Sequence, residues 1–238
     1  MDITQFFYLP LAPEFFVILA AACLLVLVLS LIRRAYRQLG LSPAQAMLLL
    51  IGSLIGSCIN IPLTVISTDS VMAEQMVEFF GMRYPIPPPT DWGGTVLAIN
   101  VGGAIIPVVM SVFLLIRWQL WFPGLLATAV VSAICYWFSS AVPGMGIAVP
   151  VFIPALAATV LALLLSRQSA APLAYIAGSL GTLIGGDLLN YGQLAELGAP
   201  ILSIGGAGTF DAVFLTGVIA VLITGLSPRR EGTGPTAS

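Results

Sequence analysis

Two acidic side chains stand in stretches of the chain that are otherwise apolar and rich in glycine. Asp187 lies in GTLIGGDLLN and Asp211 lies in GGAGTFDAVF. If these stretches cross a membrane, each carboxylate costs roughly 2.5 to 3.5 kcal/mol on insertion scales. Chains that keep such a group usually direct it toward the protein interior, a cavity or an ion path. We therefore take Asp187 and Asp211 as the candidate functional pair.

Three amide side chains are expected at the same depth as the two aspartates. Asn190 follows Asp187 by one helical turn, while Asn60 and Asn100 stand near the matching ends of two other apolar stretches. The one cation that could fold back to this layer is Arg83 of the adjoining loop. Without a counter-charge, two close carboxylates cannot both stay ionised cheaply, so one would hold a proton or both would share a cation.

This polar layer is compatible with three kinds of function. The first is a cation or proton site in a transporter-like or channel-like protein, with broken backbone near Gly205, Gly206 and Gly208 as further ligands. The second is an aspartyl dyad that activates water to cut a peptide bond inside the membrane. The third is a scaffold or assembly factor in which the acids are structural; Asp211 would then stabilise the first turn of its helix. We favour the first.

The protease alternative can be compared with known motifs. Intramembrane aspartyl proteases of the presenilin type carry Tyr-Asp, Gly-x-Gly-Asp and Pro-Ala-Leu on successive helices. In this chain Gly186 precedes Asp187, but Pro154-Ala155-Leu156 comes before both aspartates instead of after them. The match is loose and out of order, so it assigns no catalytic role to either acid.

Glycines are expected to serve packing and backbone shape near the candidate pair. Gly178, Gly181 and Gly185 recur at helical spacing and form one stripe of small residues. Such stripes let helices approach closely in membranes. Gly206 and Gly208 interrupt the stretch that leads to Asp211. We expect these residues to shape the site through the backbone.

The composition indicates an integral membrane protein. The chain has 238 residues, of which 59% are hydrophobic and 8% charged, with a mean hydropathy of +1.07. Soluble domains carry about 25% charged residues. Apolar runs long enough to cross roughly 30 Å of hydrocarbon recur along the sequence. Seven all-α spans are predicted, at about 15–32, 43–66, 93–116, 120–141, 147–165, 172–190 and 207–226.

The spans are predicted to form one transmembrane domain over residues 1–226, with a long outer loop at 67–92 and a short polar cytoplasmic tail at 227–238. Within the loop, the apolar positions of residues 71–82 favour a short surface helix. Histidine and lysine are absent, which removes the commonest transition-metal ligand and Schiff-base chemistry. We expect no metal, no cofactor and no nucleic-acid partner.

The arginines predict the orientation. With the N-terminus outside, seven of the eight cationic residues fall on the inner side, in agreement with the positive-inside rule. The seven are Arg33, Arg34, Arg37, Arg117, Arg167, Arg229 and Arg230. The predicted location is therefore the cytoplasmic (inner) membrane, with the N-terminus outside, the C-terminus inside and the lipid bilayer as partner.

A weak internal repeat is visible. GSLIGSCIN (52–60) runs parallel to GTLIGGDLL (181–189), with Gly, Leu, Ile and Gly in register. Spans 1–3 and 5–7 are then three-helix repeats that point the same way across the membrane, and span 4 connects them.

Three stretches of the chain resemble a known family. INIPL (59–63), GGDLLN (185–190) and SIGGAGTFDAVFLTG (203–217) together resemble the bacterial and archaeal multi-spanning membrane proteins called domain of unknown function 1614. The resemblance runs from the second span to the seventh. It implies that Asp187, Asn190 and Asp211 occupy the family's motif positions. The family has no settled activity, so the resemblance implies no catalytic role.

Overall fold

The chain is mostly helical, as predicted. The computed structural model describes residues 13–66, 76–79, 82–85, 95–142, 146–194, 201–206 and 212–225. The helices are α1 (Pro13–Gln38), α2 (Pro43–Ser57), α3 (Ile106–Trp118), α4 (Trp121–Phe138), α5 (Phe152–Leu165), α6 (Ala170–Thr182), α7 (Tyr191–Leu194) and α8 (Ala212–Thr224). Two π-helical turns, η2 (Val101–Ile105) and η3 (Leu183–Leu188), extend α3 and α6.

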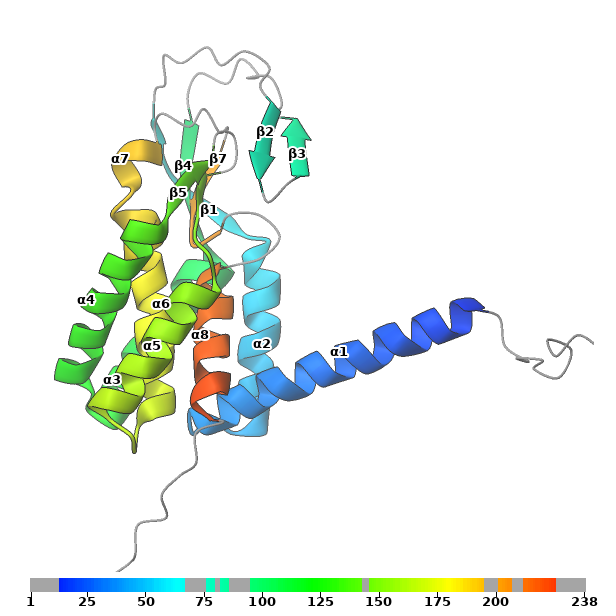
Figure 1. The fold of residues 1–238 in the computed structure, drawn as a ribbon, viewed down its shortest axis with the longest axis vertical. Helices are drawn as coiled ribbons and strands as arrows, with labels where there is room; N and C mark the ends of the chain where they lie inside the picture. Colours follow the sequence, from blue (N-terminus) through cyan, green and yellow to red (C-terminus); the bar gives the residue numbers. More distant parts are fainter. Residues whose placement is uncertain are drawn as a thin grey trace, which may run out of the picture.

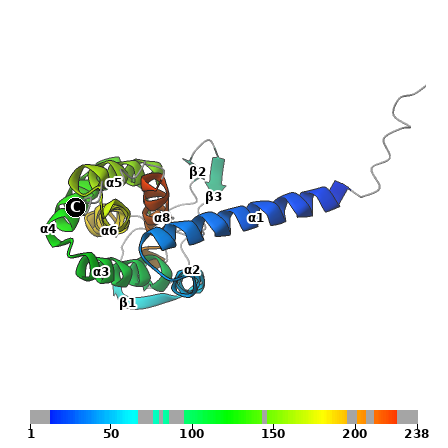
Figure 2. The same cartoon turned by 90° about the horizontal axis from the view of Figure 1, so that it is seen from below.

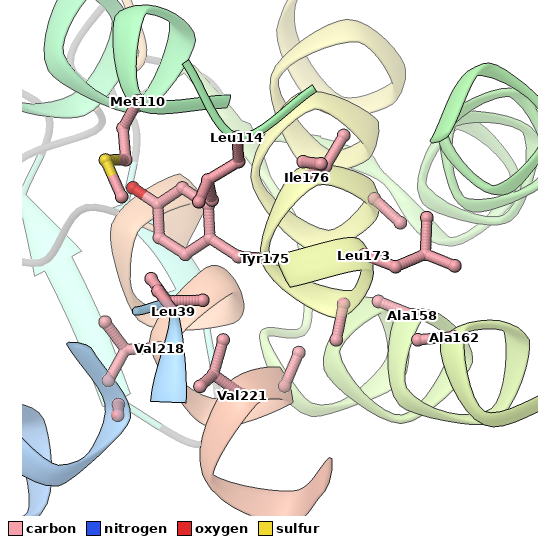
Figure 3. Close-up of a cluster of buried hydrophobic side chains, with 14 of the residues drawn as sticks. Leu39, Met110, Leu114, Ala158, Ala162, Leu173, Tyr175, Ile176, Val218 and Val221 are labelled. Atoms are coloured by element: carbon pink, nitrogen blue, oxygen red, sulfur yellow. The ribbon is translucent and has the colours of Figure 1, made fainter. Parts of the chain in front are cut away.

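Helix α6 forms the centre of a bundle. Figure 2 shows α3, α4, α5 and α8 arranged around it. Nearly every residue of α6 is buried, which its small side chains permit because they let neighbouring helices approach closely. Its largest buried side chain, Tyr175, belongs to the same apolar cluster as Met110 and Leu114 of α3 (Figure 3).

Helix α1 is attached to the bundle only at its C-terminal end. Ala35, Tyr36 and Leu39 are buried there, whereas the helix is exposed from Ile18 to Leu31. The rest of α1 projects away from the other helices (Figure 1). Most of Ile18–Gln38, a segment long and apolar enough to cross a membrane, thus lies outside the bundle.

A small sheet lies at the opposite end of the bundle from the attachment of α1 (Figure 1). Its order is β1-β4-β7, with β1 antiparallel and β7 parallel to β4. Leu97 and Leu202 of this sheet pack with Ile147. The strands are β1 (Asn60–Ile66), β4 (Thr95–Asn100) and β7 (Ile201–Ile204), and two hairpins pair β2 (Met76–Phe79) with β3 (Met82–Pro85) and β5 (Ser140–Val142) with β6 (Gly146–Ala148).

The prediction of an all-α chain is wrong at the ends of several spans. The predicted span 43–66 is helical only to Ser57 and continues as β1, and the span 93–116 opens with β4. Helix α2 starts as a capping box, because Ser42 Oγ accepts from Gln45 N and Gln45 Oε1 accepts from Ser42 N. It cannot continue through Pro62, and the flanking β-branched residues favour a strand. Hydropathy alone does not distinguish an apolar strand from an apolar helix.

The described part of the chain contains three helices long and apolar enough to cross a membrane: Ile18–Gln38, Val101–Trp118 and Trp121–Phe138. Shorter apolar helices cover Ala44–Ser57, Phe152–Leu165 and Ala212–Thr224. Seven spans and the three-helix repeat remain predictions. The predicted surface helix at 71–82 is wrong where the chain is described, because residues 76–79 and 82–85 form the β2–β3 hairpin.

Candidate functional site

Three strands bring polar side chains together at the sheet end of the bundle. Asn60 and Asn100 are direct partners in the β1–β4 pairing. Asn100 Nδ2 donates to Asn60 Oδ1 at 3.0 Å, and Ser203 Oγ of β7 donates to the same oxygen at 2.6 Å. The two asparagines expected at one depth therefore lie in contact. Ser203, which the sequence analysis did not single out, joins them from the glycine-rich block.

Asn100 is committed to holding the backbone. Its side chain is 2% exposed, and its Nδ2 also donates to the Ser57 carbonyl at 2.8 Å. Its Oδ1 accepts from Gly103 N at 2.8 Å and so caps the start of η2. Capping satisfies a donor that a helix start otherwise leaves without a partner. Asn100 thus ties the end of α2 to β4 and η2.

Asp187 lies in the π-turn η3 and is held by the peptide backbone. Its Oδ2 accepts a hydrogen bond from Gly205 N at 2.6 Å. A hydrogen bond from a backbone N–H to a carboxylate is charge-assisted, so it is short and stronger than a bond between neutral groups. Gly205 directly follows β7, so the carboxylate and the Asn60–Ser203 contact meet at neighbouring points of one strand end.

Gly205 is shaped for this position. It has φ +78°, in the left-handed region that glycine adopts without strain. A Cβ placed on Gly205 would lie 2.6 Å from both Gly103 C and Ala104 N. The residue is therefore seated between the backbone of η2 and the carboxylate of η3. Ala104, Leu183 and Val213 form the small apolar cluster beside it, where η2, η3 and α8 converge.

Asn190 secures the other side of η3. Its side chain is 3% exposed, and Nδ2 donates to the carbonyls of Gly185 at 2.9 Å and Gly186 at 3.0 Å. It also donates to Ser139 Oγ, just beyond α4, at 2.9 Å. The expected spacing of one helical turn between Asp187 and Asn190 assumed an α-helix, but residues 183–188 form the π-turn η3. Asn190 positions the segment that carries Asp187.

The glycines lie where backbones approach each other. A Cβ on Gly181 would lie 2.6 Å from Val131 Cβ, and one on Gly185 would lie 2.7 Å from Cys135 Cβ, both on α4. A Cβ on Gly206 would lie 3.0 Å from Asn100 Cβ and from Ser203 Oγ. Helix α4 can therefore pack against α6 and η3 only because residues 181 and 185 are glycine. The Asn100 side chain can likewise lie against residue 206 only because it is glycine.

Part of the predicted site lies outside the described residues. Asp211 and Gly208 belong to that part, and α8 begins at Ala212. The pairing of Asp187 with Asp211 therefore remains a prediction. What the structure brings together is Asp187, Gly205, Ser203, Asn60 and Asn100, with Asn190 toward α4.

The chemistry available at this site is that of oxygen ligands. Carboxylate, amide and hydroxyl oxygens suit hard cations, and a carboxylate can also carry a proton. Over the residues that the structure describes, no group of three or more His, Cys, Asp or Glu side chains could hold a metal ion. The arginines of the helical bundle lie at the opposite end (Figure 1).

The comparisons with known proteins give one match. The family described as "Protein of unknown function (DUF1614)" matches residues 54–223. No match was found to a curated protein or to a solved structure. The matched segment contains every residue of the site described above, from Asn60 to Gly205, and it runs from the second predicted span to the seventh. The chain therefore belongs to the DUF1614 family of proteins of unknown function.

Proposed function

We propose that this protein is a multi-pass inner-membrane protein of transporter-like or channel-like type that binds a cation or a proton at Asp187. The observation that carries the proposal is the Asp187–Gly205 bond at the junction of two π-turns. Irregular backbone of this kind is frequent at functional sites in helices and at binding sites of membrane transporters. Asp211 is the proposed second carboxylate.

The exposed aromatic side chains support a membrane around the bundle. Trp121 and Phe122 are exposed at the start of α4, and Trp137 and Phe138 are exposed at its end. The 18 residues of α4 span about 27 Å at 1.5 Å per residue, close to the hydrocarbon thickness. Aromatic residues gather at both membrane surfaces. The site would then lie near one surface and the arginines near the other.

The positive-inside rule supports placing the arginine end in the cytoplasm. Arg33, Arg34, Arg37, Arg117 and Arg167 all belong to helix ends or turns at that end of the bundle. The sheet and Asp187 then face the outer side. A solute would reach Asp187 from outside, with Ser203 Oγ as a neighbouring oxygen ligand. Asn60 Oδ1 already accepts from Asn100 Nδ2 and Ser203 Oγ, so it would join only by giving up one of these bonds.

The test is ion-dependent stabilisation of the purified protein. We expect one of Na⁺, K⁺, Mg²⁺ or a pH change to raise the melting temperature of the wild type. A ligand at 100 times its Kd adds about 2.7 kcal/mol, which corresponds to several degrees. Asp187→Asn and Asp211→Asn should each abolish the response, because the amide cannot carry the charge. The matched control is Glu14→Gln, in the first turn of α1 at the end that projects away from the bundle (Figure 1), which should respond like the wild type.

The proposal fails if no ion and no pH change stabilises the wild type, or if Asp187→Asn responds fully. The same variants separate the protease alternative. Cleavage of a transmembrane reporter that depends on both aspartates, without ion-dependent stabilisation, would reassign the site to peptide hydrolysis. Folded variants that respond and behave like the wild type throughout would leave the aspartates a structural role.

A further inference from the structure

The end of the bundle opposite the acidic site carries a rim of exposed arginines. Arg33, Arg34 and Arg37 lie in the last turns of α1, Arg117 lies in the last turn of α3, and Arg167 lies between α5 and α6. All five side chains are exposed. The fold gathers these ends in space, because Gly40 packs toward Trp118 and Gly225 toward Gln38.

The rim cannot be neutralised by the segments that form it. No Asp or Glu occurs in residues 15–68 or in residues 92–186. These two ranges include all of helices α2, α3, α4, α5 and α6. Arg33 and Arg37 are four residues apart on α1, where like charges repel. The C-terminal end of a helix contributes only about −0.5 elementary charge. The positive charge on the last turns of α1 therefore exceeds what the helix itself can offset.

The position of the rim indicates which anion it meets. Trp118 is 37% exposed and Trp121 is 48% exposed, and both lie beside the arginines at the start of the apolar surface of the bundle. Tryptophan at this level is typical of the membrane headgroup region. Guanidinium groups bind phosphate oxygens in pairs, with better geometry than ammonium groups. An anion at this level that carries phosphate next to hydrocarbon is a phospholipid headgroup.

We infer that this arginine rim binds the headgroups of anionic phospholipids, with Arg33, Arg34, Arg37 and Arg117 as phosphate ligands. The inference rests on the membrane placement proposed above, and it does not depend on the acidic site. Anionic lipid would anchor the last turn of α1 to the bundle, since Arg117 and the Gly40–Trp118 contact adjoin it.

The test uses purified protein in nanodiscs of phosphatidylglycerol with phosphatidylcholine, and in discs of phosphatidylcholine alone. We expect a higher melting temperature in the mixed discs and retention of phosphatidylglycerol in native mass spectrometry. The triple variant Arg33→Gln/Arg34→Gln/Arg37→Gln should weaken lipid retention on the order of 100-fold, at about fivefold per arginine, and the effect should shrink at high salt. Arg83→Gln, in β3 at the other end of the molecule, is the matched control.

A folding defect is checked with the corresponding triple lysine variant, which keeps the charge and should keep most of the lipid preference. Equal stabilisation by both kinds of disc would overturn the inference, as would wild-type retention in the glutamine triple variant or equal loss in Arg83→Gln. Stabilisation by inorganic phosphate alone would also overturn it, in favour of a free-anion site. If no ion or pH change stabilises the wild type but its lipid selectivity is intact, the proposed acidic site fails and the lipid inference stands.

Discussion

At the scale of single residues, the site depends on a few amide side chains that each make several hydrogen bonds. Asn100 uses both its amide nitrogen and its oxygen on the backbone and on Asn60. Asn190 uses its nitrogen on two carbonyls and one hydroxyl. Amides so engaged position the chain. The carboxylate of Asp187 and the hydroxyl oxygen of Ser203 are the groups at the site whose oxygens could bind a cation.

Gly205 gives a sharp test at this scale. Gly205→Ala must place a Cβ 2.6 Å from the η2 backbone at φ +78°, so we expect a loss of about 2 kcal/mol or more. The bond to Asp187 should be displaced, and the ion response should fall with it. Thermal unfolding with and without the stabilising ion measures both effects.

The matched control for this variant is Gly192→Ala in α7, where an added Cβ meets nothing within 4 Å. It should change stability little and leave the ion response intact. Equal melting temperatures and equal ion responses in Gly205→Ala and Gly192→Ala would contradict a role for the close packing of Gly205 in the site.

The residues of the site were predictable from the sequence in part. Asp187, Asn60 and Asn100 were identified because a polar group in an apolar run is costly and therefore informative. Ser203 was missed, because a hydroxyl among glycines carries little cost and only strand pairing brings it to Asn60. The contacts of Asn190 with the Gly185 and Gly186 carbonyls were not predicted, because a π-turn cannot be recognised from periodicity over six residues.

At the scale of elements, the central fact is the contact between α4 and α6 with its η3 extension. Gly181 and Gly185 let the two helices approach at the level just below Asp187. The same contact includes the Cys135 thiol, whose Sγ donates to Thr182 Oγ1 at 3.8 Å. A shift of α4 here would move the segment that carries the carboxylate.

Gly185→Ala tests this contact. The new methyl would meet Cys135 Cβ at 2.7 Å and the Ser132 backbone still more closely, so we expect a loss of about 1 to 3 kcal/mol from overpacking. Gly52→Ala in α2 is the control, because its Cβ would meet Ile106 at an ordinary 3.8 Å. Alanine favours the helix by roughly 0.5 to 1 kcal/mol, so that variant should be neutral or stabilised. The melting temperatures of Gly185→Ala and Gly52→Ala are measured in the same detergent. Equal decreases in the two variants would contradict close packing at Gly185.

Element boundaries show where sequence reasoning stops. The span predicted at 120–141 corresponds to α4 at Trp121–Phe138, because tryptophan and apolar residues mark both ends clearly. The span predicted at 43–66 contains α2 and then β1, since hydropathy measures burial in lipid and says little about backbone conformation. The β4–β7 pairing joins segments about one hundred residues apart, and no local pattern encodes such a partner.

At the scale of the whole molecule, the two ends of the bundle have opposite chemistry. One end holds exposed arginines and the other holds Asp187 and the sheet (Figure 1). We expect the arginine end to face the cytoplasm. The orientation can be measured with single cysteines placed in exposed turns, after replacement of Cys23, Cys58 and Cys135.

Gly192→Cys and Gln168→Cys are suitable, because both positions are exposed and lie at opposite ends of the bundle. A membrane-impermeant maleimide should label Gly192→Cys in intact cells. It should label Gln168→Cys only after the membrane is disrupted. The reverse pattern would invert the topology, and labelling of both in intact cells would contradict a bundle that crosses the membrane.

The contact between Asn60 and Ser203 joins residues 143 positions apart. Ribosomes synthesise the chain from its N-terminus, so α2 and β1 are made long before β7. In a nascent chain halted before Ile201, Asn60 would lack its contact with Ser203 of β7, and Asp187 would lack its bond to Gly205, which follows β7. The polar contacts of Asn60 and Asp187 with this segment therefore form only after residues 201–205 have been synthesised.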